Sequence, residues 1–300
     1  LADNRIAGSL PPDIGNIPEL VTIDLSHNMV SGELPSSLRN ATKLDLIQLA
    51  HNKISAFAQE PVFGPSNPAL SFIDLSFNQI SGTVPSYLFY LPQLTLLRLH
   101  HNKLSGTVHD AVAHLPRLET VDLSYNDLSG TVPSMFWTLV NLYLKSNKFE
   151  GDLPFFSRIQ QIDVSFNQFT SWGRFFGSPL QSASLINFAS NQMVGSIAGD
   201  VLNFAGANVV IFANNSLSGT IPTIPFLGTL GSHHFDFSNN HFEGFLPSIT
   251  ITHVAATLAR LDFSSNNFSG NIPTNYGLVP GLETLYLHRN HLTGDLSPIF

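Results

Sequence analysis

The stretch of residues 118–136, LETVDLSYNDLSGTVPSMF, contains a pattern that the rest of the chain repeats. Its apolar residues alternate with polar ones, as a short strand with one buried face requires: Leu118, Val121 and Leu123. Asn126 follows, where a side-chain amide can pair with backbone groups that a turn leaves unmatched. Gly130 permits backbone conformations that other residues avoid, and Pro133 removes a backbone donor. A unit this small cannot bury its own apolar side, so copies of it must stack.

The turn asparagine recurs at a nearly constant spacing along the chain. Neighbouring copies are 20 to 26 residues apart, at Asn4, Asn28, Asn52, Asn78, Asn102, Asn126, Asn147, Asn167, Asn191, Asn215, Asn240, Asn266 and Asn290. This period and the pattern L-x-x-L-x-L-x-x-N are the signature of leucine-rich repeats. The sequence therefore predicts an α/β solenoid of about 13 coils, with the asparagines forming a structural ladder along the turns.

The second half of each unit narrows the family. The element L-x-G-x-I/L/V-P occurs at residues 128–133 and recurs at 30–35, 80–85, 217–222 and 268–273. It closely resembles the plant-specific leucine-rich repeats of cell-surface receptor kinases, receptor-like proteins and polygalacturonase-inhibiting proteins. The resemblance implies a right-handed superhelix with a long parallel β-sheet on its concave side, short strands on one flank and few regular helices. It also implies an extracellular recognition role.

The charge balance limits the possible partners. The chain has 13 basic and 21 acidic residues, a net charge of −8, and no basic run. Nucleic acid is therefore not expected as a partner, because phosphate binding needs clustered Lys and Arg. No apolar run approaches the roughly 18 residues that span a bilayer, so membrane attachment is expected only through segments outside the chain.

Residues 1–300 are predicted to form a single solenoid segment, because a solenoid grows by adding coils and has no separate cores. The chain begins and ends inside a repeat, so both polar end caps are expected to lie outside it. Caps built without disulfides are the alternative. The related plant proteins usually carry paired cysteines in their caps, whereas this sequence has no cysteine.

The coils that follow Asn52, Asn126 and Asn147 differ in length from the regular 24 residues. After Asn52 the chain is two residues longer and lacks the Gly-x-x-Pro element, so residues 53–68 are expected to bulge from the convex surface. The coils that follow Asn126 and Asn147 have only 21 and 20 residues. Their convex segments are expected to be extended, because a helical turn does not fit.

Strand geometry indicates which side chains face the concave surface: the residue between the last two strand leucines, and the one two places later. Asp followed two residues later by Ser is the commonest pair there and is expected to be solvated. Several coils instead carry Arg, Lys, His or aromatic side chains, which offer large contact area on a rigid sheet at little entropic cost. They form the candidate ligand-binding patch: Gln48, Asp74, Phe77, Arg98, His100, His101, Asp122, Tyr125, Tyr143 and Lys145. Asp74 and Asp122 are expected to hold the Arg98 guanidinium; the alternative is a decorated surface that binds nothing.

A second candidate patch near the carboxyl end consists of Arg260, Tyr286, His288 and Arg289. The twelve histidines do not predict a metal site, because the intervening Phe77 coil keeps His51 and His101 about 10 Å apart. A pH-sensitive contact with a partner in a mildly acidic cell wall is the alternative role, since imidazole titrates near pH 6.5.

Nothing in the sequence predicts an enzyme or a cofactor. It has no cysteine, no G-x-S-x-G element, no phosphate-binding loop and no kinase sequence. Aspartates on an open sheet face water, so nothing would raise the pKa of one of them for acid–base catalysis. Three N-glycosylation sequons begin at Asn40, Asn214 and Asn267, and Asn40, expected on the convex side, is the preferred site.

The leading functional interpretation is a segment of the ectodomain of a receptor kinase or receptor-like protein at the cell surface. It would bind a peptide, a small ligand or a partner protein such as a co-receptor on its concave or lateral face. One alternative is a structural leucine-rich-repeat protein of a cell wall, surface coat or extracellular filament, whose neighbours are copies of itself. Another is an inhibitor of a secreted cell-wall hydrolase, although the plant inhibitors are shorter and cysteine-capped.

Overall fold

The computed structural model describes residues 1–110, 117–171, 183–197, 207–221, 224–226, 232–251, 257–279 and 281–296. The chain divides into two compact units, Leu1–Glu150 and Gly151–Phe300. They are named unit 1 and unit 2 below, and each is described by itself. A single solenoid over residues 1–300 therefore stays a prediction.

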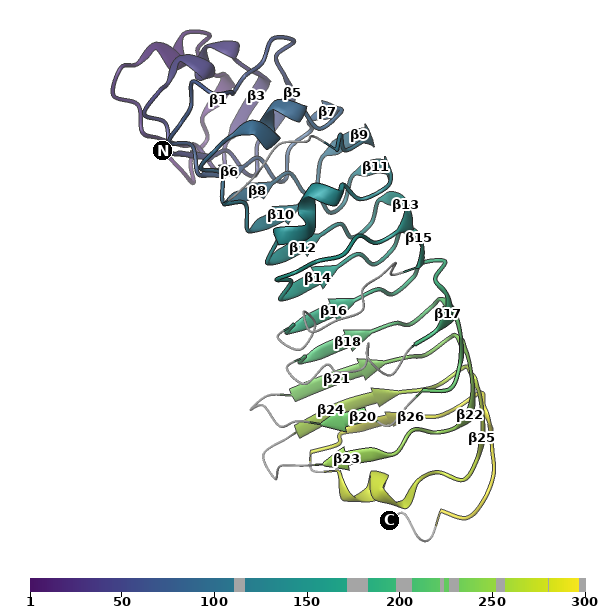
Figure 1. Ribbon diagram of the computed structural model, residues 1–300. Coiled ribbons are helices and arrows are strands. Elements are labelled where there is room, and N and C mark those ends of the chain that lie inside the picture. Colours follow the sequence, from purple (N-terminus) through teal and green to yellow (C-terminus); the bar gives the residue numbers. More distant parts are fainter. Residues whose placement is uncertain are drawn as a thin grey trace. The chain divides into compact units, whose positions relative to one another are not determined.

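The main sheet of unit 1 takes one short strand from each coil (Figure 1). In sheet order the strands are β2 (Thr22–Asp24), β4 (Leu46–Gln48), β6 (Phe72–Asp74), β8 (Leu96–Arg98), β10 (Thr120–Asp122) and β12 (Asn141–Tyr143). Neighbouring strands are parallel and in register, so that Gln48 pairs with Asp74 and Asp74 with Arg98. The middle residue of each strand is buried, as Ile47 and Ile73 are, so the first and last residues share the outer face. That outer face is called the sheet face of unit 1.

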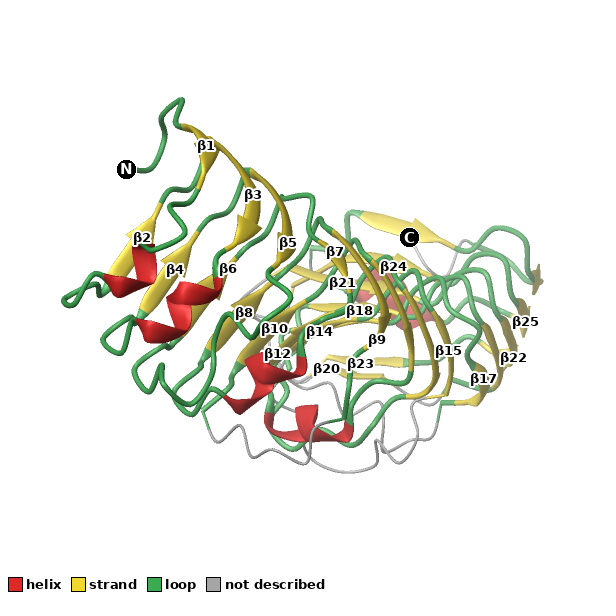
Figure 2. Cartoon of the chain, turned by 90° about the horizontal axis from the view of Figure 1, so that it is seen from above, coloured by secondary structure: helices red, strands yellow, loops and turns green. Residues whose placement is uncertain are grey.

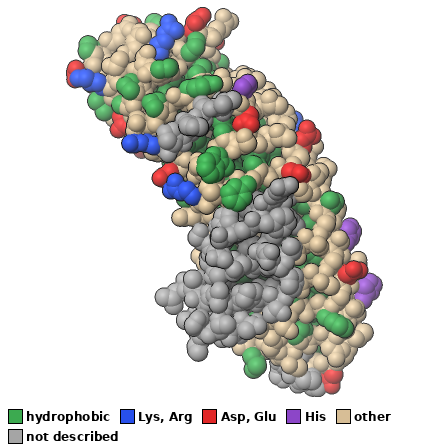
Figure 3. Space-filling view, in the orientation of Figure 1, with side chains coloured by type: hydrophobic (Ala, Val, Ile, Leu, Met, Phe, Trp, Pro, Cys, Tyr) green, Lys and Arg blue, Asp and Glu red, His purple; other side chains and the backbone are tan. Residues whose placement is uncertain are grey.

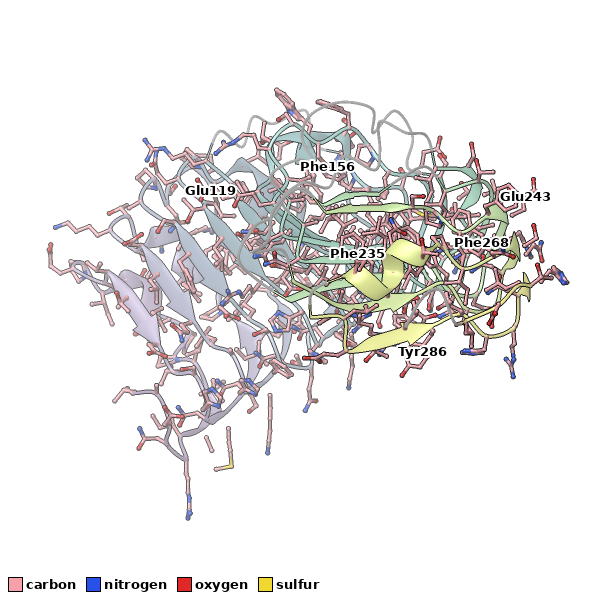
Figure 4. The ribbon with its side chains drawn as sticks, turned by 90° about the horizontal axis from the view of Figure 1, so that it is seen from below. Glu119, Phe156, Phe235, Glu243, Phe268 and Tyr286 are labelled. Atoms are coloured by element: carbon pink, nitrogen blue, oxygen red, sulfur yellow. The ribbon has the colours of Figure 1, made fainter. Side chains whose placement is uncertain are left out.

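Unit 2 repeats this arrangement. Its main-sheet strands are β14 (Gln161–Asp163), β16 (Leu185–Asn187), β18 (Val209–Ile211), β21 (Ser232–Asp236), β24 (Thr257–Asp262) and β26 (Thr284–Tyr286). They are also parallel, with one register shift between His233 and His234 where β21 pairs with β24. Figure 4 shows Phe235 and Phe268 inside unit 2, where both are buried, and Tyr286 on the outside of β26.

A row of flank strands follows the turn asparagines. It contains β1 (Ala7–Ser9), β3 (Met29–Leu34), β5 (Lys53–Phe57), β7 (Ser81–Gly82), β9 (Lys103–Thr107) and β11 (Asp127–Gly130) in unit 1, β13 (Lys148–Asp152) at the boundary, and β15 (Gln168–Ser171), β17 (Val194–Ser196), β19 (Ser216–Gly219), β22 (His241–Phe245), β25 (Asn267–Gly270) and β27 (His291–Leu292) in unit 2. A further pair, β20 (Ile224–Phe226) and β23 (Ile249–Ile251), lies in unit 2. Gly130 shows why glycine recurs here: its φ is +77°, and a Cβ would lie 2.8 Å from the Thr107 methyl group.

The third side of a coil carries a short 3-10 turn or no helix. The turns are η1 (Ile14–Asn16), η2 (Ser36–Asn40), η3 (Ser86–Tyr90), η4 (Ser134–Thr138) and η6 (Thr274–Leu278), and Figure 2 shows them in red beside the strands. The proline of the L-x-G-x-I/L/V-P element is the N-cap of η2, η3, η4 and η6, because proline presets the φ needed to enter the turn. No α-helix occurs in the described ranges, and no helix there is long and apolar enough to cross a bilayer.

The turn asparagines face inward and join neighbouring coils. Asn52 is 8% exposed; its Oδ1 accepts a hydrogen bond from the Val30 N–H at 2.8 Å, and its Nδ2 donates to the oxygens of Leu25 and Leu49 at 2.8 and 3.1 Å. The same three kinds of bond recur at Asn28, Asn78, Asn102, Asn126, Asn147, Asn191, Asn215, Asn240, Asn266 and Asn290. Asn167 Nδ2 donates to the oxygens of Val164 and Ser165. Each asparagine side chain thus forms hydrogen bonds with backbone N–H and C=O groups of two successive turns that would otherwise lack a partner.

The longer coil after Asn52 is packed more closely than a surface bulge. Lys53–Phe57 forms β5, and the side chains of Val62 and Phe63 are buried. Asn67 is also buried, and its Nδ2 donates to the oxygens of Leu38 and Ala41. The expected bulge is therefore wrong for the second half of residues 53–68, because apolar side chains and an asparagine from this segment fill the interior of the coil.

The short coil between Asn126 and Asn147 contains η4, although an extended segment was expected there. Its missing residues come from the link between the 3-10 turn and the next strand: two residues separate η4 from β12, whereas five separate η2 from β4. The expectation was wrong because the turn itself was assumed to be the part that shortens. In the following coil, residues 153–160 contain no helical turn, as expected.

Candidate functional site

One backbone conformation positions the residues beside the turn asparagines. The residue before each turn asparagine has a left-handed φ between 52° and 57°, at Asp3, His27, His51, Phe77, His101, Tyr125, Ser146, Phe166, Ser190, Asn214, Asn239, Ser265 and Arg289. Eleven of these residues, all except Ser146 and Arg289, donate their N–H to a carbonyl of the next coil, as the His51 N–H does to the Ser76 oxygen at 3.0 Å. Equivalent side chains in one unit therefore leave successive coils in the same direction, about one strand spacing apart.

Five of these side chains form a continuous stack, which is called the ring ladder: His27, His51, Phe77, His101 and Tyr125. Successive ring centroids lie 4.2, 4.1, 4.3 and 4.1 Å apart, with 11° to 15° between the ring planes. The inner rings cover one another's faces, while edges remain open to solvent: Phe77 and Tyr125 are 38% and 39% exposed. His27 and His51 are not among the predicted site residues, although their place in the repeat is the same.

His100 packs against the middle of the ring ladder. Its ring stands nearly perpendicular to those of Phe77 and His101, with centroid distances of 5.1 and 5.6 Å. His100 Nδ1 lies 3.1 Å from Asp122 Oδ2. Burial raises the pKa of Asp122, but the contact with His100 and the hydrogen bond from the Ser124 N–H together outweigh burial, so the pKa of Asp122 lies below its usual value. Asp122 is therefore a carboxylate that is already engaged.

Arg98 and Asp74 form a charged pair beside His100 on the sheet face. Arg98 Nη1 lies 3.5 Å from Asp74 Oδ2, and Asp74 Oδ1 accepts hydrogen bonds from the N–H and hydroxyl of Ser76 at 3.0 and 2.6 Å. Asp122 was expected to hold the same guanidinium, but its carboxylate contacts His100 Nδ1 instead. Among the described residues, Arg98 therefore has one carboxylate partner, and its side chain is 42% exposed.

The other predicted residues of the first patch lie at its two ends. Gln48 pairs in register with Asp74, and Tyr143 pairs in register with Asp122. Lys145 Nζ lies 5.6 Å from the centroid of Tyr125, a cation–π contact on the last ring of the ladder. The structure thus places all ten predicted residues on neighbouring strands of unit 1 and the turns that follow them.

A row of apolar side chains completes the sheet face, and this row was not predicted from the sequence. Leu46, Phe72 and Leu96 begin β4, β6 and β8 and lie side by side in register. They are two residues before the last residue of each strand, so they point to the same face, and all three are half-buried. The strand alternation already contained this signal. The sheet face of unit 1 therefore has an apolar row on one side and the ring ladder on the other, with Arg98 between them.

The second predicted patch is partly assembled in unit 2. The Arg260 guanidinium lies 5.0 Å from the Tyr286 ring centroid and 3.5 Å from Asp262 Oδ2, and the rings of Tyr286 and His288 are 6.2 Å apart. Arg289 occupies the left-handed position of its turn. His234, which was not predicted, pairs in register with Arg260; burial and then the charge of Arg260 lower the pKa of His234.

The predicted glycosylation residues are all exposed. Asn40 ends η2, and its Nδ2 donates to Asn16 Oδ1 at 2.8 Å. Asn214 accepts a hydrogen bond from Asn239, and Asn267 begins β25. Within the described ranges, no three His, Cys, Asp or Glu side chains are arranged to hold a metal ion. On the face drawn in Figure 3, basic side chains lie among acidic ones in the upper part of the view.

Comparisons with known sequences support the repeat assignment. Two sequence profiles of the leucine-rich-repeat family match the chain, one over residues 68–128 and 92–149 and the other over residues 19–41, 257–277 and 281–300. No curated protein matches the sequence significantly.

Solved structures resemble the chain over nearly all of its length. The ectodomain of the Arabidopsis thaliana receptor kinase GASSHO1/SCHENGEN3, in complex with CASPARIAN STRIP INTEGRITY FACTOR 2, is 26% identical with a TM-score of 0.76, over 98% of this chain and 38% of that one. The Arabidopsis HAESA ectodomain, in complex with an extended IDA peptide hormone, is 29% identical with a TM-score of 0.82, over 97% of this chain and 49% of that one. A plant ice-binding protein, 24% identical over 98% of this chain and 79% of that one, shares the fold with a TM-score of 0.61.

This chain spans less than half the length of the two receptor ectodomains. The repeated parallel strands, the proline-capped 3-10 turns, the matching profiles and these structural neighbours lead to one assignment. The chain is a leucine-rich-repeat protein whose repeats are of the plant type.

Proposed function

We propose that the protein is a non-enzymatic recognition module that binds an extended peptide, or an extended segment of a partner protein, on the sheet face of unit 1. The observation that carries this proposal is the connected surface of ring ladder, Arg98–Asp74 pair and apolar row on one parallel sheet. Such a surface combines large rigid contacts with one oriented charge. Both reduce the entropy lost when a flexible ligand binds.

The position of these groups favours a ligand that crosses several coils. Leu46, Phe72 and Leu96 come from three successive main-sheet strands, and the ring ladder from five successive turns. A ligand that lies across the strands therefore meets the same two rows along its length. An extended chain, whose side chains alternate between two sides, fits that arrangement better than a compact small molecule.

The proposed setting is the extracellular part of a receptor kinase or receptor-like protein. The two Arabidopsis ectodomains that resemble this chain are described in complex with a peptide hormone or an integrity factor, and they supply the support for this choice. Because the chain covers 38% and 49% of those proteins, the receptor assignment extends beyond the residues compared. A partner ectodomain and membrane anchorage through other segments belong to the same proposal.

The test is selection from a displayed library of random dodecapeptides on the complete 300-residue chain, followed by affinity measurement for the selected peptides. Arg98→Ala combined with Tyr143→Ala is expected to weaken binding at least about a hundredfold, since half-buried Arg and Tyr anchors on a rigid sheet are typical hot spots. The matched control is Arg39→Ala combined with Tyr90→Ala, which removes an exposed Arg and Tyr from η2 and η3.

Unchanged affinity in the Arg98→Ala, Tyr143→Ala variant would place the ligand elsewhere and reject the proposed site. If no peptide is selected and the chain instead associates with itself in a concentration-dependent way, the structural alternative replaces the receptor interpretation.

A further inference from the structure

The ring ladder offers a partner the edges of its rings and not their faces. Each inner ring is sandwiched at 4.1 to 4.3 Å, and the ring edges are the exposed part. Aromatic edges carry partial positive charge, and the imidazoles of His27, His51 and His101 add ring nitrogens there. Oxygen atoms of a partner are therefore the matching chemistry, while the stacking of a planar ligand on the inner rings is blocked.

Charged side chains close to the ring ladder in the sequence also favour an acidic partner. Lys53 and Lys103 each follow a ladder histidine by two residues, are exposed, and take part in no ion pair in the described part of the chain. Lys145 lies over the last ring. Several carboxylates near the ladder already have partners: Asp74 contacts Arg98 and Ser76, Asp24 Oδ1 accepts hydrogen bonds from the N–H and hydroxyl of Ser26, and Asp127 Oδ1 lies 2.8 Å from Lys148 Nζ. Asp3 is exposed at the equivalent turn position one coil before His27. Asp122 is paired with His100.

We propose that the ring ladder is the contact strip for an acidic extended peptide, whose Asp or Glu carboxylates lie along the ring edges while its apolar side chains lie over Leu46, Phe72 and Leu96. This inference rests on the proposed function. It adds His27, His51, Lys53 and Lys103 to the binding site and specifies the chemistry of the ligand.

Proton uptake by the ladder histidines accompanies binding. Burial and the neighbouring His27 lower the pKa of His51, with Asp74 opposing and His100 adding to the shift. Burial and His100 likewise lower the pKa of His101, with Asp122 opposing and His51 adding to it. Both imidazoles are thus mostly neutral at pH 7, and a carboxylate placed at their edges raises their pKa in the complex. Affinity must then increase as the pH falls through the pKa of the complex, and level off below the pKa of the free protein.

An acidic polysaccharide would share the charge but fits the surface less well. Sugar rings typically lie on exposed aromatic faces, whereas the inner rings of the ladder are covered on both faces. The half-buried apolar row also has no counterpart in a chain of charged sugars. A peptide satisfies both rows, because neighbouring side chains of an extended strand point to opposite sides.

The experiment uses the complete chain and the peptide library of the preceding section, with selection at pH 5.5 and at pH 7.5. Peptides selected at pH 5.5 are expected to be enriched in Asp and Glu. Their affinity is expected to be at least about tenfold higher at pH 5.5 than at pH 7.5, because each of the two histidines, His51 and His101, contributes up to a factor of about ten if its pKa rises by about one on binding. Replacement of their acidic residues by Asn and Gln should abolish this difference.

Three variants assign the effect to the ladder. His51→Phe combined with His101→Phe keeps a stack of rings and removes two titrating groups, so the pH dependence should be lost. Lys53→Gln combined with Lys103→Gln should weaken binding about tenfold at both pH values and leave the pH dependence intact. His109→Phe is the matched control, because His109 is exposed in unit 1 and lies outside the ladder. Its pH dependence should equal that of the unmodified chain.

Selected peptides that lack acidic residues, or that bind equally at both pH values, would overturn this inference while leaving the proposed function in place. The same holds if the double His→Phe variant keeps the pH dependence. Binding of an oligogalacturonate that depends on Lys53 and Lys103, without binding of any acidic peptide, would replace the peptide by a polysaccharide. Failure to select any peptide at either pH would reject the proposed function itself.

Discussion

At the scale of single residues, the position before the turn asparagine contributes to both the fold and the candidate site. L-residues adopt left-handed φ values at a cost of about 1–2 kcal/mol, yet thirteen non-glycine residues do so among the described turns. None of the thirteen is Val, Ile or Thr, whose branched Cβ atoms tolerate this conformation least. Backbone hydrogen bonds to the next coil, such as that of His51 to Ser76, hold the strained conformation in place.

Substitution at Ser190 tests the backbone cost at this position. Ser190 has a φ of 55° and carries no ring, so the ring ladder is unaffected. Ser190→Val is expected to reduce the free energy of unfolding by about 1–2 kcal/mol, because a β-branched residue resists the left-handed region. Ser190→Asn, the matched control, should leave stability nearly unchanged, since asparagine enters that region readily. Urea denaturation measures both, and equal midpoints for the two variants would contradict the argument.

The pairing of Asp122 with His100 makes a second prediction at this scale. The pKa of Asp122 is below its usual value in the folded protein, so the unfolded chain binds its proton first as the pH falls. The contribution of this carboxylate to stability is therefore present above about pH 4 and is lost as the pH falls further, toward the pKa of the folded state. Asp122→Asn should flatten the decrease in unfolding free energy between about pH 5 and pH 3. Asp13→Asn, at an exposed turn, should not, and identical acid profiles for all three proteins would refute the assignment.

The spacing of the repeat predicts some features of the candidate site and not others. Period and alternation predict which positions face the solvent, so Arg98, His100 and Tyr143 lie on the expected surface. They do not contain side-chain rotamers. The stacking of the ring ladder depends on side-chain rotamers and on the register of neighbouring coils, and so does the contact of Asp122 with His100 instead of Arg98. Neither was therefore predicted.

At the scale of elements, the two units fill equivalent core positions differently. The buried residue directly after each main strand is leucine in unit 1, for example Leu99 and Leu123, whereas four coils of unit 2 carry Phe188, Phe212, Phe237 and Phe263 there. Phe237 stacks between Phe212 and Phe263 at 5.7 and 5.5 Å, and Phe242 and Phe268 contact the stack edge-on. Unit 2 thus has an aromatic interior with the same strand arrangement.

Phe237 provides the stability test for this interior. Phe237→Ala is expected to cost about 3–5 kcal/mol, because a fully buried ring between two others is lost and a cavity remains. Phe237→Leu introduces the residue that unit 1 uses at the same position and should cost less than half as much. The measurement is chemical denaturation followed by circular dichroism. Equal effects of the two substitutions would contradict this expectation, because leucine would then recover none of the lost apolar burial.

The strands and turns lie where the repeat predicts them, except in the coils of unusual length. Regular coils gave the strands at the expected places, since each buries the same apolar positions. The length of a coil does not indicate which of its segments is shorter than usual, so η4 was not predicted. Nor does it state whether an insertion turns inward, so the buried Val62 and Phe63 were missed as well. Both depend on packing against neighbouring coils, which a single repeat does not contain.

At the scale of the whole molecule, stability is expected to be local. Each asparagine of the ladder bonds only to its own coil and the preceding one, as Asn52 does to Leu49, Leu25 and Val30. Main-sheet strands likewise pair with their neighbours in the row. Repeat proteins of this kind behave as chains of units coupled to their nearest neighbours, without one central core.

Asn52→Ala tests this locality. It leaves the Val30 N–H and the Leu25 and Leu49 oxygens without their side-chain partner in a buried turn, at a cost on the order of 3 kcal/mol. Amide hydrogen exchange should accelerate in β3, β4 and β6, which flank the turn, and remain unchanged in β22 and β25 of unit 2. Asn16→Ala, an exposed asparagine on η1, is the control and should alter neither region. Uniform acceleration in both units would mean that the chain unfolds as one cooperative body, and nearest-neighbour coupling would then be the wrong description.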